Sequence, residues 1–193
     1  MLTNCKLCWP LIILCTVVAI SLVIALAFVQ AYRARAEAAR YVEVITQLRI
    51  GTTYDLALQQ LRDANISVDM PTDCHHECLL DLEFVNKWQY KLHLAPPIAL
   101  VGNLRFKDEK LVYKTTLLGG SNPYSAGVRE TISTVSAVRV HQYKVAVDLS
   151  PSDFTEFRRL AYSFDLKCIG SMRQCNADEF LPTVNELERI TPK

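Results

Sequence analysis

The chain has 193 residues, and its 21 lysines and arginines nearly balance its 20 aspartates and glutamates. A neutral chain lacks the clustered positive charge with which proteins displace counterions from nucleic acid. Glycine occurs only 6 times, and neither GxGxxG nor GxxxxGK(S/T) is present, so no phosphate-binding loop is indicated. The sequence therefore predicts no nucleic-acid partner and no bound cofactor.

An uncharged run of 26 residues, Leu7–Tyr32, is the strongest signal in the chain. A membrane-spanning helix requires roughly 20 apolar residues to cross ~30 Å of hydrocarbon. The run predicts a transmembrane helix over residues 9–30, preceded by a tail of residues 1–8. The flanking aromatic and basic side chains are expected at the membrane interface, and they are Trp9, Tyr32, Arg33 and Arg35.

Two other N-terminal signals compete with an uncleaved anchor. Ala25-Leu26-Ala27 resembles a signal-peptide cleavage site, but the apolar segment of a signal peptide is usually only ~7–15 residues long. A lipoprotein signal is disfavoured, because Leu14 precedes Cys15 where a small residue is expected. We therefore favour a single-pass protein of the cell (inner or plasma) membrane, with the lipid bilayer as a partner.

The orientation signals conflict. The positive-inside bias favours a cytoplasmic domain, because Lys6 precedes the span and four arginines follow it: Arg33, Arg35, Arg40 and Arg49. Long domains, however, are translocated largely regardless of charge. Four cysteines in the domain are also typical of an oxidising compartment. We favour an extracytoplasmic domain.

The transmembrane helix is expected to continue into water. Residues 31–50 are rich in alanine, arginine and glutamate, which are strong helix formers. Helical spacing gives this segment one apolar stripe, formed by Tyr41, Val44, Ile45 and Leu48. We predict a helical stalk over residues 31–50 whose end packs on the domain.

A second helix start follows in LRIGTTYDLALQQL, residues 48–61. Gly51 is suited to end one helix, and the threonines with Asp55 are suited to begin the next. This stretch resembles the opening helix motif of small outer-membrane-assembly lipoproteins and of β-lactamase-inhibitor-protein-like modules, although those families lack this chain's cysteine pattern and uncleaved anchor. The resemblance implies a helix on a small antiparallel sheet, in a binding or assembly module. The overall layout resembles single-pass bacterial membrane proteins of unknown function.

The centre of the chain changes to the two-residue period of β-strands. Residues 67–83 are interpreted as a polar connection, and residues 88–94 and 98–106 as strands with alternating apolar side chains. The charged segment 107–110 predicts a hairpin turn, and residues 111–117 the returning strand.

The pattern continues after a loop at residues 119–127, with strands predicted over 128–135 and 141–149. Ser150-Pro151 predicts a helix start, and residues 164–169 are interpreted as a short strand. A last short helix is predicted to begin near Asn176 and to end at Pro182. The prediction is an α+β domain over residues 51–184, with a polar tail at 185–193. It has an antiparallel sheet of about five strands packed by about three helices.

The four domain cysteines predict two disulfides. They are Cys74, Cys78, Cys168 and Cys175, and four cysteines allow three connectivities. We favour pairing within each sequence-local pair, because each short loop can close. Cross-pairing would instead join the segment before the sheet to the C-terminal region.

The same segment contains the densest group of metal-binding residue types: Cys74, His75, His76, Glu77 and Cys78. Thiolate, imidazole and carboxylate groups all bind zinc or copper. We favour the disulfides and expect no metal, and we keep a metal site at Cys74, His75, His76 and Cys78 as the alternative.

Nothing in the sequence indicates catalysis. No GxSxG motif is present, and His93 and His141 fall in strand-like patterns. We therefore expect no catalytic residues. The predicted function is a membrane-anchored, non-catalytic accessory, assembly or scaffold subunit that binds protein partners in a membrane complex. A ligand- or metal-binding sensor domain is the alternative, and a hydrolase ranks last.

Overall fold

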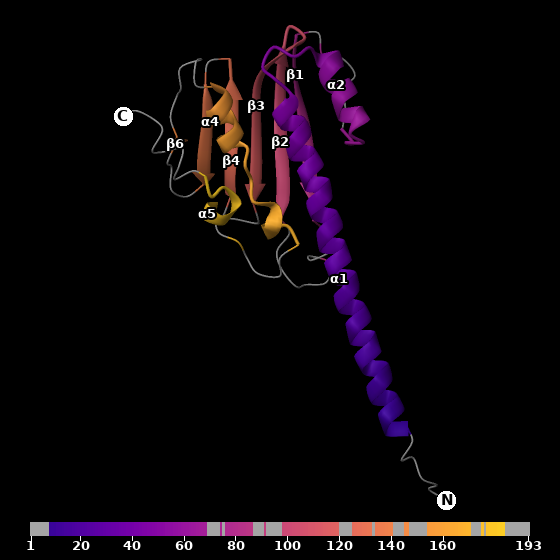
Figure 1. Ribbon diagram of the computed structural model, residues 1–193. Helices are drawn as coiled ribbons and strands as arrows, with labels where there is room; N and C mark the ends of the chain where they lie inside the picture. Colours follow the sequence, from indigo (N-terminus) through magenta and orange to yellow (C-terminus); the bar gives the residue numbers. More distant parts are fainter. Residues whose placement is uncertain are drawn as a thin grey trace, which may run out of the picture.

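The computed structural model describes residues 8–68, 74, 76–86, 91, 98–119, 125–132, 134–140, 145–146, 154–170, 175 and 177–183. Helix α1 (Cys8–Gln47) has 40 residues and is therefore ~60 Å long. Its first half is exposed and projects from the domain (Figure 1). Among the described residues, α1 is the one helix long and apolar enough to cross a membrane, a test that a signal sequence also meets.

A meander of antiparallel strands forms the sheet, in the spatial order β1-β2-β3-β4-β5-β6. The hairpin between β2 and β3 turns at Asp108 and Glu109, whose φ angles are 49° and 63°, as predicted for residues 107–110. The predicted α+β class, with an N-terminal apolar helix before an antiparallel sheet, is confirmed. The strands are β1 (Glu77–Val85), β2 (Ala99–Lys107), β3 (Lys110–Gly119), β4 (Ser125–Thr131), β5 (Val135–Val140) and β6 (Val145–Ala146).

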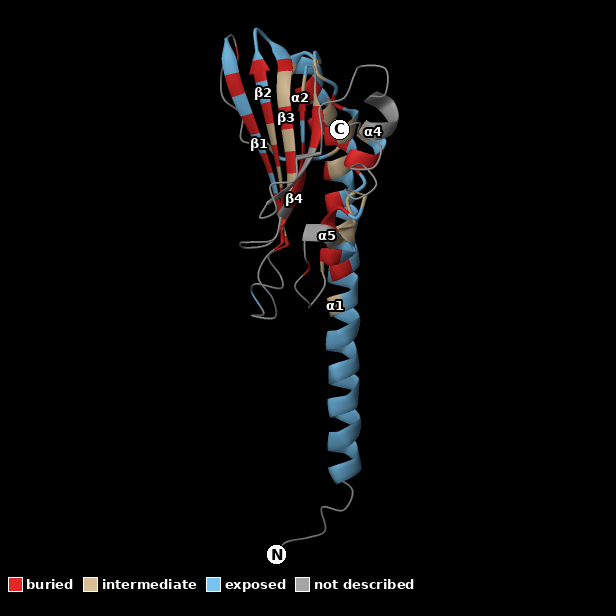
Figure 2. Ribbon diagram, turned by 90° about the vertical axis from the view of Figure 1, so that its left-hand side faces the viewer, coloured by how far each residue is buried: buried red, intermediate tan, exposed pale blue. Residues whose placement is uncertain are grey.

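The helices and the sheet form two layers. Figure 2 shows α1 and the later helices on one side of the sheet, with the other side turned away from them. We call these the inner and outer faces. Tyr54, at the start of α2, meets Phe106 of the inner face edge-on at 5.2 Å between ring centroids. The remaining elements are α2 (Tyr54–Asp63), α4 (Phe154–Ala161), the 3-10 helix η2 (Leu166–Cys168) and α5 (Ala177–Phe180).

The second half of α1 is a core helix of the domain. The sequence predicted a stalk of which only the end packs, whereas burial begins at Ala31, directly after the exposed apolar half. Small side chains at helical spacing let the helix lie close to the domain, and larger ones fill the core further along. The buried positions are Ala31, Ala34, Ala38, Tyr41, Val44, Ile45 and Leu48.

The first strand lies where a polar connection was predicted. Residues 77–83 belong to β1, and the prediction of a connection over 67–83 is wrong for that part. The alternation in ECLLDLEFV explains the strand, because every second side chain is buried: Cys78, Leu80, Leu82 and Phe84. The other side chains expose acidic groups along a sheet edge, which disfavours pairing with another chain.

Other strand and loop boundaries also differ from those predicted. The loop predicted over 119–127 ends earlier, because β4 begins at Ser125. The strand predicted over 128–135 is two strands, β4 and β5. Between them, the Thr131 amide donates to the Thr134 carbonyl at 2.8 Å, and the Thr134 amide donates to the Thr131 hydroxyl at 3.2 Å. The strand predicted over 88–94, apart from Lys91, lies outside the described residues. Only Val145 and Ala146 of the strand predicted over 141–149 are described.

The C-terminal region follows the predicted helices but not the predicted strand. Helix α4 follows Ser150-Pro151, and α5 ends before Pro182. Residues 164–169 contain the 3-10 helix η2 instead of a strand. The reason is local, because the Asp165 carboxylate accepts a hydrogen bond from the Lys167 amide at 2.9 Å and caps the first turn.

The segment after η2 contacts α1 where the exposed apolar half ends. A Cβ added to Gly170 would lie 2.6 Å from the Ala31 Cβ and 2.8 Å from its Cα. One turn along, Arg35 Nε donates to the Ile169 carbonyl at 2.8 Å, and Arg35 Nη2 donates to the Lys167 carbonyl at 3.0 Å. The base of the domain is therefore fastened to the helix by a glycine contact and a guanidinium.

The Gly170→Ala substitution tests this contact. Gly170 has φ +82°, so alanine incurs a left-handed backbone cost as well as the clash with Ala31. We expect the free energy of unfolding to fall by ~2–4 kcal/mol, which combines about 1 for the backbone with 1–3 for overpacking. Gly51→Ala is the matched control, because φ is +92° but nothing lies within 4 Å of its added Cβ. Equal losses in denaturant unfolding of the two variants would contradict the contact.

Candidate functional site

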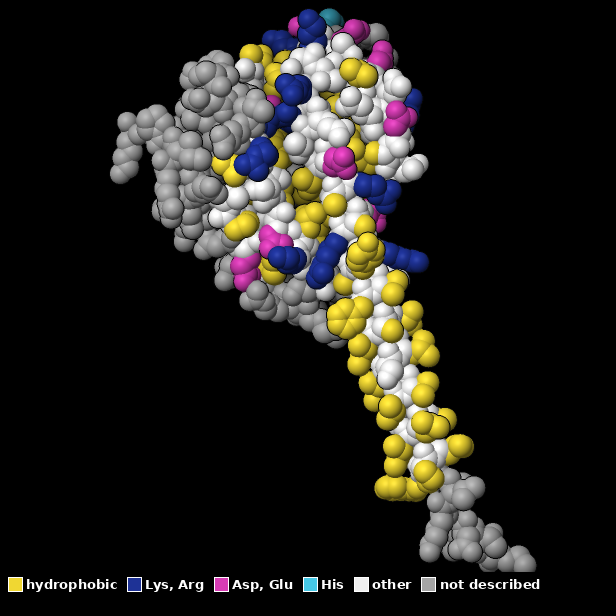
Figure 3. Space-filling view, viewed as in Figure 1, with side chains coloured by type: hydrophobic (Ala, Val, Ile, Leu, Met, Phe, Trp, Pro, Cys, Tyr) yellow, Lys and Arg dark blue, Asp and Glu magenta, His cyan; other side chains and the backbone are white. Residues whose placement is uncertain are grey.

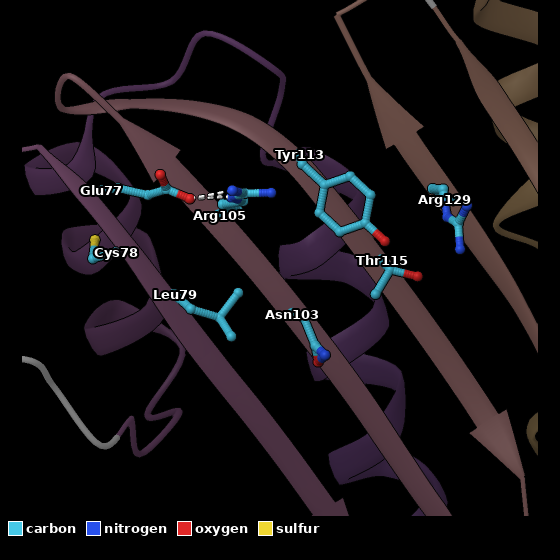
Figure 4. Close-up of a pocket in the computed structure, with 8 residues that line it drawn as sticks. All are labelled: Glu77, Cys78, Leu79, Asn103, Arg105, Tyr113, Thr115 and Arg129. Carbon is cyan, nitrogen blue, oxygen red and sulfur yellow. Dashed lines mark hydrogen bonds and ion pairs between the residues drawn. The ribbon is translucent and has the colours of Figure 1, made fainter.

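A shallow hollow lies on the outer face of the sheet, across β1 to β4. Figure 4 shows it with α1 behind the strands, and the lining side chains other than Cys78 point away from the helices. The alternation of β2 aims Asn103 and Arg105 outward while Leu104 and Phe106 point into the core. The hollow has a volume of about 720 Å³, and its lining residues are Glu77, Cys78, Leu79, Asn103, Arg105, Tyr113, Thr115 and Arg129.

The hollow is lined by more positive than negative side chains. Arg105 forms an ion pair with Glu77, and both side chains are about half exposed, at 55% and 51%. Arg129 is exposed, and its guanidinium lies over the Tyr113 ring, 6.0 Å from the ring centroid. Among the described residues, Arg129 has no carboxylate partner. Two guanidinium groups and one carboxylate leave the hollow with a net positive charge.

Polar groups at the floor of the hollow complete its chemistry. The Thr115 hydroxyl donates to the Val128 carbonyl at 3.0 Å. The Asn103 Oδ1 atom is buried and has no hydrogen-bond partner among the described residues. Cys78 is disulfide-bonded, so it offers no thiolate. These groups are suited to binding an anionic or hydrogen-bonding surface, and no lining residue forms a nucleophile–base pair.

Apolar side chains on the outer face extend this surface. Leu79 is 50% exposed, and Val101 and Leu117 are half-buried. Leu117 pairs in register with Val101 on one side and with Gly127 on the other. A partner would therefore meet an apolar strip beside a cationic hollow, the combination typical of a protein interface.

The alternation of side chains along β3 is interrupted near its start. Within the predicted strand 111–117, Leu111 is buried while Tyr113, two residues on, lies on the outer face. A bulge is the reason, because Phe106 pairs with Leu111 whereas Arg105 pairs with Tyr113. One extra residue on β3 reverses the faces of everything after it.

The same shift turns a lysine into the core. Lys114 is fully buried on the inner face, close to Glu130 of β4 and to Arg158 and Tyr162 of the α4 region. One carboxylate oxygen, Glu130 Oε2, lies 3.0 Å from Lys114 Nζ, 3.2 Å from Arg158 Nε and 3.1 Å from the Tyr162 hydroxyl. We call these four side chains the buried cluster.

The buried cluster caps the C-terminal end of α1. Lys114 Nζ donates to the Ile45 carbonyl at 2.8 Å and to the Leu48 carbonyl at 2.5 Å. Arg158 Nη2 donates to the carbonyls of Thr46 and Leu48. The last carbonyls of a helix have no intrahelical donors and lie at the negative end of its dipole. Two cations from distant parts of the chain therefore satisfy this helix end.

Burial also shifts the proton affinities in the cluster. Desolvation lowers the pKa of the Lys114 ammonium to about 8, although the nearby Glu130 carboxylate opposes the shift. Burial raises the pKa of Tyr162 well above 10.0, and Glu130 acts in the same direction. The buried cluster is inaccessible to a substrate, so we interpret it as structural.

Replacing Glu130 by glutamine tests the balance of charge in the cluster. Glu130→Gln leaves Lys114 and Arg158 buried without a counter-charge, and we expect a loss of ~3–5 kcal/mol in the free energy of unfolding. Glu77→Gln, which breaks the half-exposed pair with Arg105, should cost at most ~1 kcal/mol. Denaturant unfolding of both variants measures the difference, and similar small losses would show that the cluster contributes little.

The Lys114 pKa predicts a pH dependence. Its folded value of about 8 lies below the unfolded value of 10.5, so the unfolded chain binds more protons between these limits. Stability should therefore rise with pH from about 8 until Tyr162 opposes it above 10.0, with a slope of at most ~1.4 kcal/mol per pH unit. Lys114→Met should flatten this rise in denaturant unfolding, and parallel curves would contradict the assignment.

The structure joins each sequence-local cysteine pair. Cys74 is bonded to Cys78 and Cys168 to Cys175, with Cα atoms 5.3 Å and 5.9 Å apart. For the alternative metal site, the Cys74 and Cys78 sulfurs are in a bond, and His76 is exposed. His75, like His93 and His141, lies outside the described residues.

A second group of metal-binding residue types occurs at the other disulfide. The ligand atoms of Cys168, Cys175 and Glu179 lie within 4.8 Å of one another. The two sulfurs are bonded together, so this group offers no thiolates to a metal as it stands.

The predicted interface residues surround the two ends of the exposed helix. Trp9 and Tyr32 are 74% and 75% exposed, and Arg33 is exposed beside Tyr32. Arg35 instead points to the domain, where it binds two carbonyls. The sequence analysis identified neither the outer hollow nor the buried cluster. A lysine and a glutamate within apolar strands, Lys114 and Glu130, are the sequence signal of the cluster.

No protein-family model, curated protein or solved structure matches this chain.

Proposed function

We propose that the protein is a membrane-anchored, non-catalytic accessory or scaffold subunit that binds a protein partner through the outer face of its sheet. The carrying observation is the outer face itself, where an apolar strip including Leu79 and Leu117 borders a hollow with net positive charge. Protein interfaces are enriched in arginine and tyrosine at such positions. The local resemblance of residues 48–61 to assembly modules points the same way.

The rigid union of α1 and the domain supports an anchored role. If α1 spans the membrane, a partner bound at Arg129 is presented in a defined direction relative to the bilayer, because the buried cluster fixes the helix end to the sheet. We also propose that the domain is extracytoplasmic. Its two disulfides favour an oxidising compartment.

The sensor hypothesis is the alternative. A metal at Cys74 and Cys78 would require reduction of their bond before thiolates could bind it. The outer hollow needs no such change before it meets a partner, so we rank the subunit hypothesis first.

Charge reversal on the outer face tests the proposal. The full chain is purified in mild detergent after crosslinking, and co-purifying proteins are identified by mass spectrometry. Arg129→Glu should remove the partner, with a loss of at least tenfold in recovery, because a central interface arginine typically contributes ~2 kcal/mol or more. Arg159→Glu, at an exposed arginine of α4, is the control and should retain the partner. A monodisperse protein without partners, or equal recovery with both variants, would contradict the proposal.

A further inference from the structure

The base of the domain lies at the depth where α1 leaves its exposed apolar half. Tyr32 is 75% exposed at the end of that half. Gly170 packs against Ala31 on the neighbouring face of the same helix turn. If the apolar half spans a bilayer, the segment Leu166–Gly170 therefore lies level with the headgroups. Figure 1 shows η2 beside α1 at the edge of the domain nearest the projecting helix.

This segment is fixed in place by its own contacts. Arg35 donates to two of its carbonyls, those of Lys167 and Ile169. Asp165 caps its first turn, and the Ile169 amide closes that turn on the Leu166 carbonyl at 3.0 Å. The segment is therefore a preformed surface that requires little ordering on binding.

Two exposed cations, Lys167 and Arg33, lie at this level, where Asp165 is also present. The Lys167 side chain is 86% exposed, and its one ion pair among the described residues, with Asp165, is long at 3.9 Å. Arg33 is exposed on the adjacent turn of α1. Figure 3 shows lysine and arginine side chains where the apolar helix enters the domain, with acidic side chains beside some of them. The charge of Lys167 and Arg33 complements phosphate at the depth that the geometry gives them.

We propose that Leu166–Gly170, together with Arg33, forms a membrane-contact surface that binds anionic phospholipid headgroups through Lys167. This rests on the membrane anchoring in the proposed function and goes beyond it, because it assigns a lipid-binding surface to the domain itself. The domain then lies directly on the bilayer. The β2–β3 hairpin, next to the end of α1, is the part furthest from the membrane.

This arrangement also sets the height of the outer hollow above the membrane. Glu77 pairs in register with Lys107, at the hairpin end of the sheet. The stretch of α1 from Tyr32 to Gln47 rises ~22 Å along the helix axis. Contact of the base with lipid thus presents the partner-binding face roughly 20 Å above the headgroups.

Hydrogen exchange of the full chain in lipid nanodiscs tests the inference. One sample contains phosphatidylcholine alone, and the other equal parts of phosphatidylcholine and phosphatidylglycerol. We expect the amides of Leu166–Gly170 to exchange about fivefold more slowly with the anionic lipid, the factor expected for one basic side chain at such a surface. High salt should remove the difference, because the contact is screened.

Matched variants separate lipid binding from a general effect of the anionic lipid. Lys167→Glu should abolish the slowing, because it replaces the exposed cation and leaves the backbone contacts with Arg35. Lys107→Glu makes the same charge change at an exposed position at the far end of β2 and should retain the slowing. Equal exchange in the two lipids, or slowing that survives Lys167→Glu, would overturn the inference.

The outcome also distinguishes this inference from the proposed anchoring. Integration is measured separately, by co-elution of the chain with the nanodisc and by its intact mass. A chain that integrates without slowed exchange contradicts only the lipid-contact surface. A chain that fails to integrate, or that loses its N-terminal helix by cleavage, contradicts the anchoring and the inference together.

Discussion

The capping of α1 by the buried cluster is the interaction on which the rest of the structure depends. The helix ends inside the protein, so its last carbonyls need donors that water cannot supply. Lys114 and Arg158 provide them, and Glu130 compensates the two cations. Three segments that are distant in sequence thus converge on one helix end. Removing Glu130 would leave both cations buried without a counter-charge, which is more costly than never burying them.

A second fastening at the base makes helix and domain one body. Arg35 donates to the carbonyls of Lys167 and Ile169, and Gly170 allows the close approach to Ala31. Between the two fastenings, alanines give way to Tyr41 and Ile45 as the gap between helix and sheet is filled. The helix that is suited to span a membrane is therefore also the central helix of the domain core. Movement of one half must move the other, which suits a subunit that orients a partner.

Helices cover one face of the sheet, and the proposed partner-binding surface lies on the other face. The inner face is occupied by α1 and the later helices (Figure 2). On the outer face, Arg129 has an aromatic ring but no carboxylate as its neighbour among the described residues. Acidic side chains of β1, such as Asp81 and Glu83, disfavour sheet-to-sheet association at that edge. The acidic edge therefore disfavours association, whereas the outer face offers an arginine to a partner. The outer face is the better candidate for binding.

Local chemistry determined what the sequence alone could predict, including the apolar helix, the alternation of residues 98–106, the 107–110 turn and the cysteine pairing within short loops. Each depends on residues that are neighbours in the chain. Tertiary structure decided the rest. One extra residue in β3 turns Tyr113 outward and Lys114 inward. The two-residue period of a strand does not predict where such a bulge occurs. The folded sheet brings together at α1 three side chains that are distant in sequence: Lys114, Glu130 and Arg158. A charge is tolerated in a core only when its partners are present, so the burial of each of them depends on this arrangement. Burial of α1 at Ala31 likewise depends on a segment distant in sequence, because Gly170 packs against it.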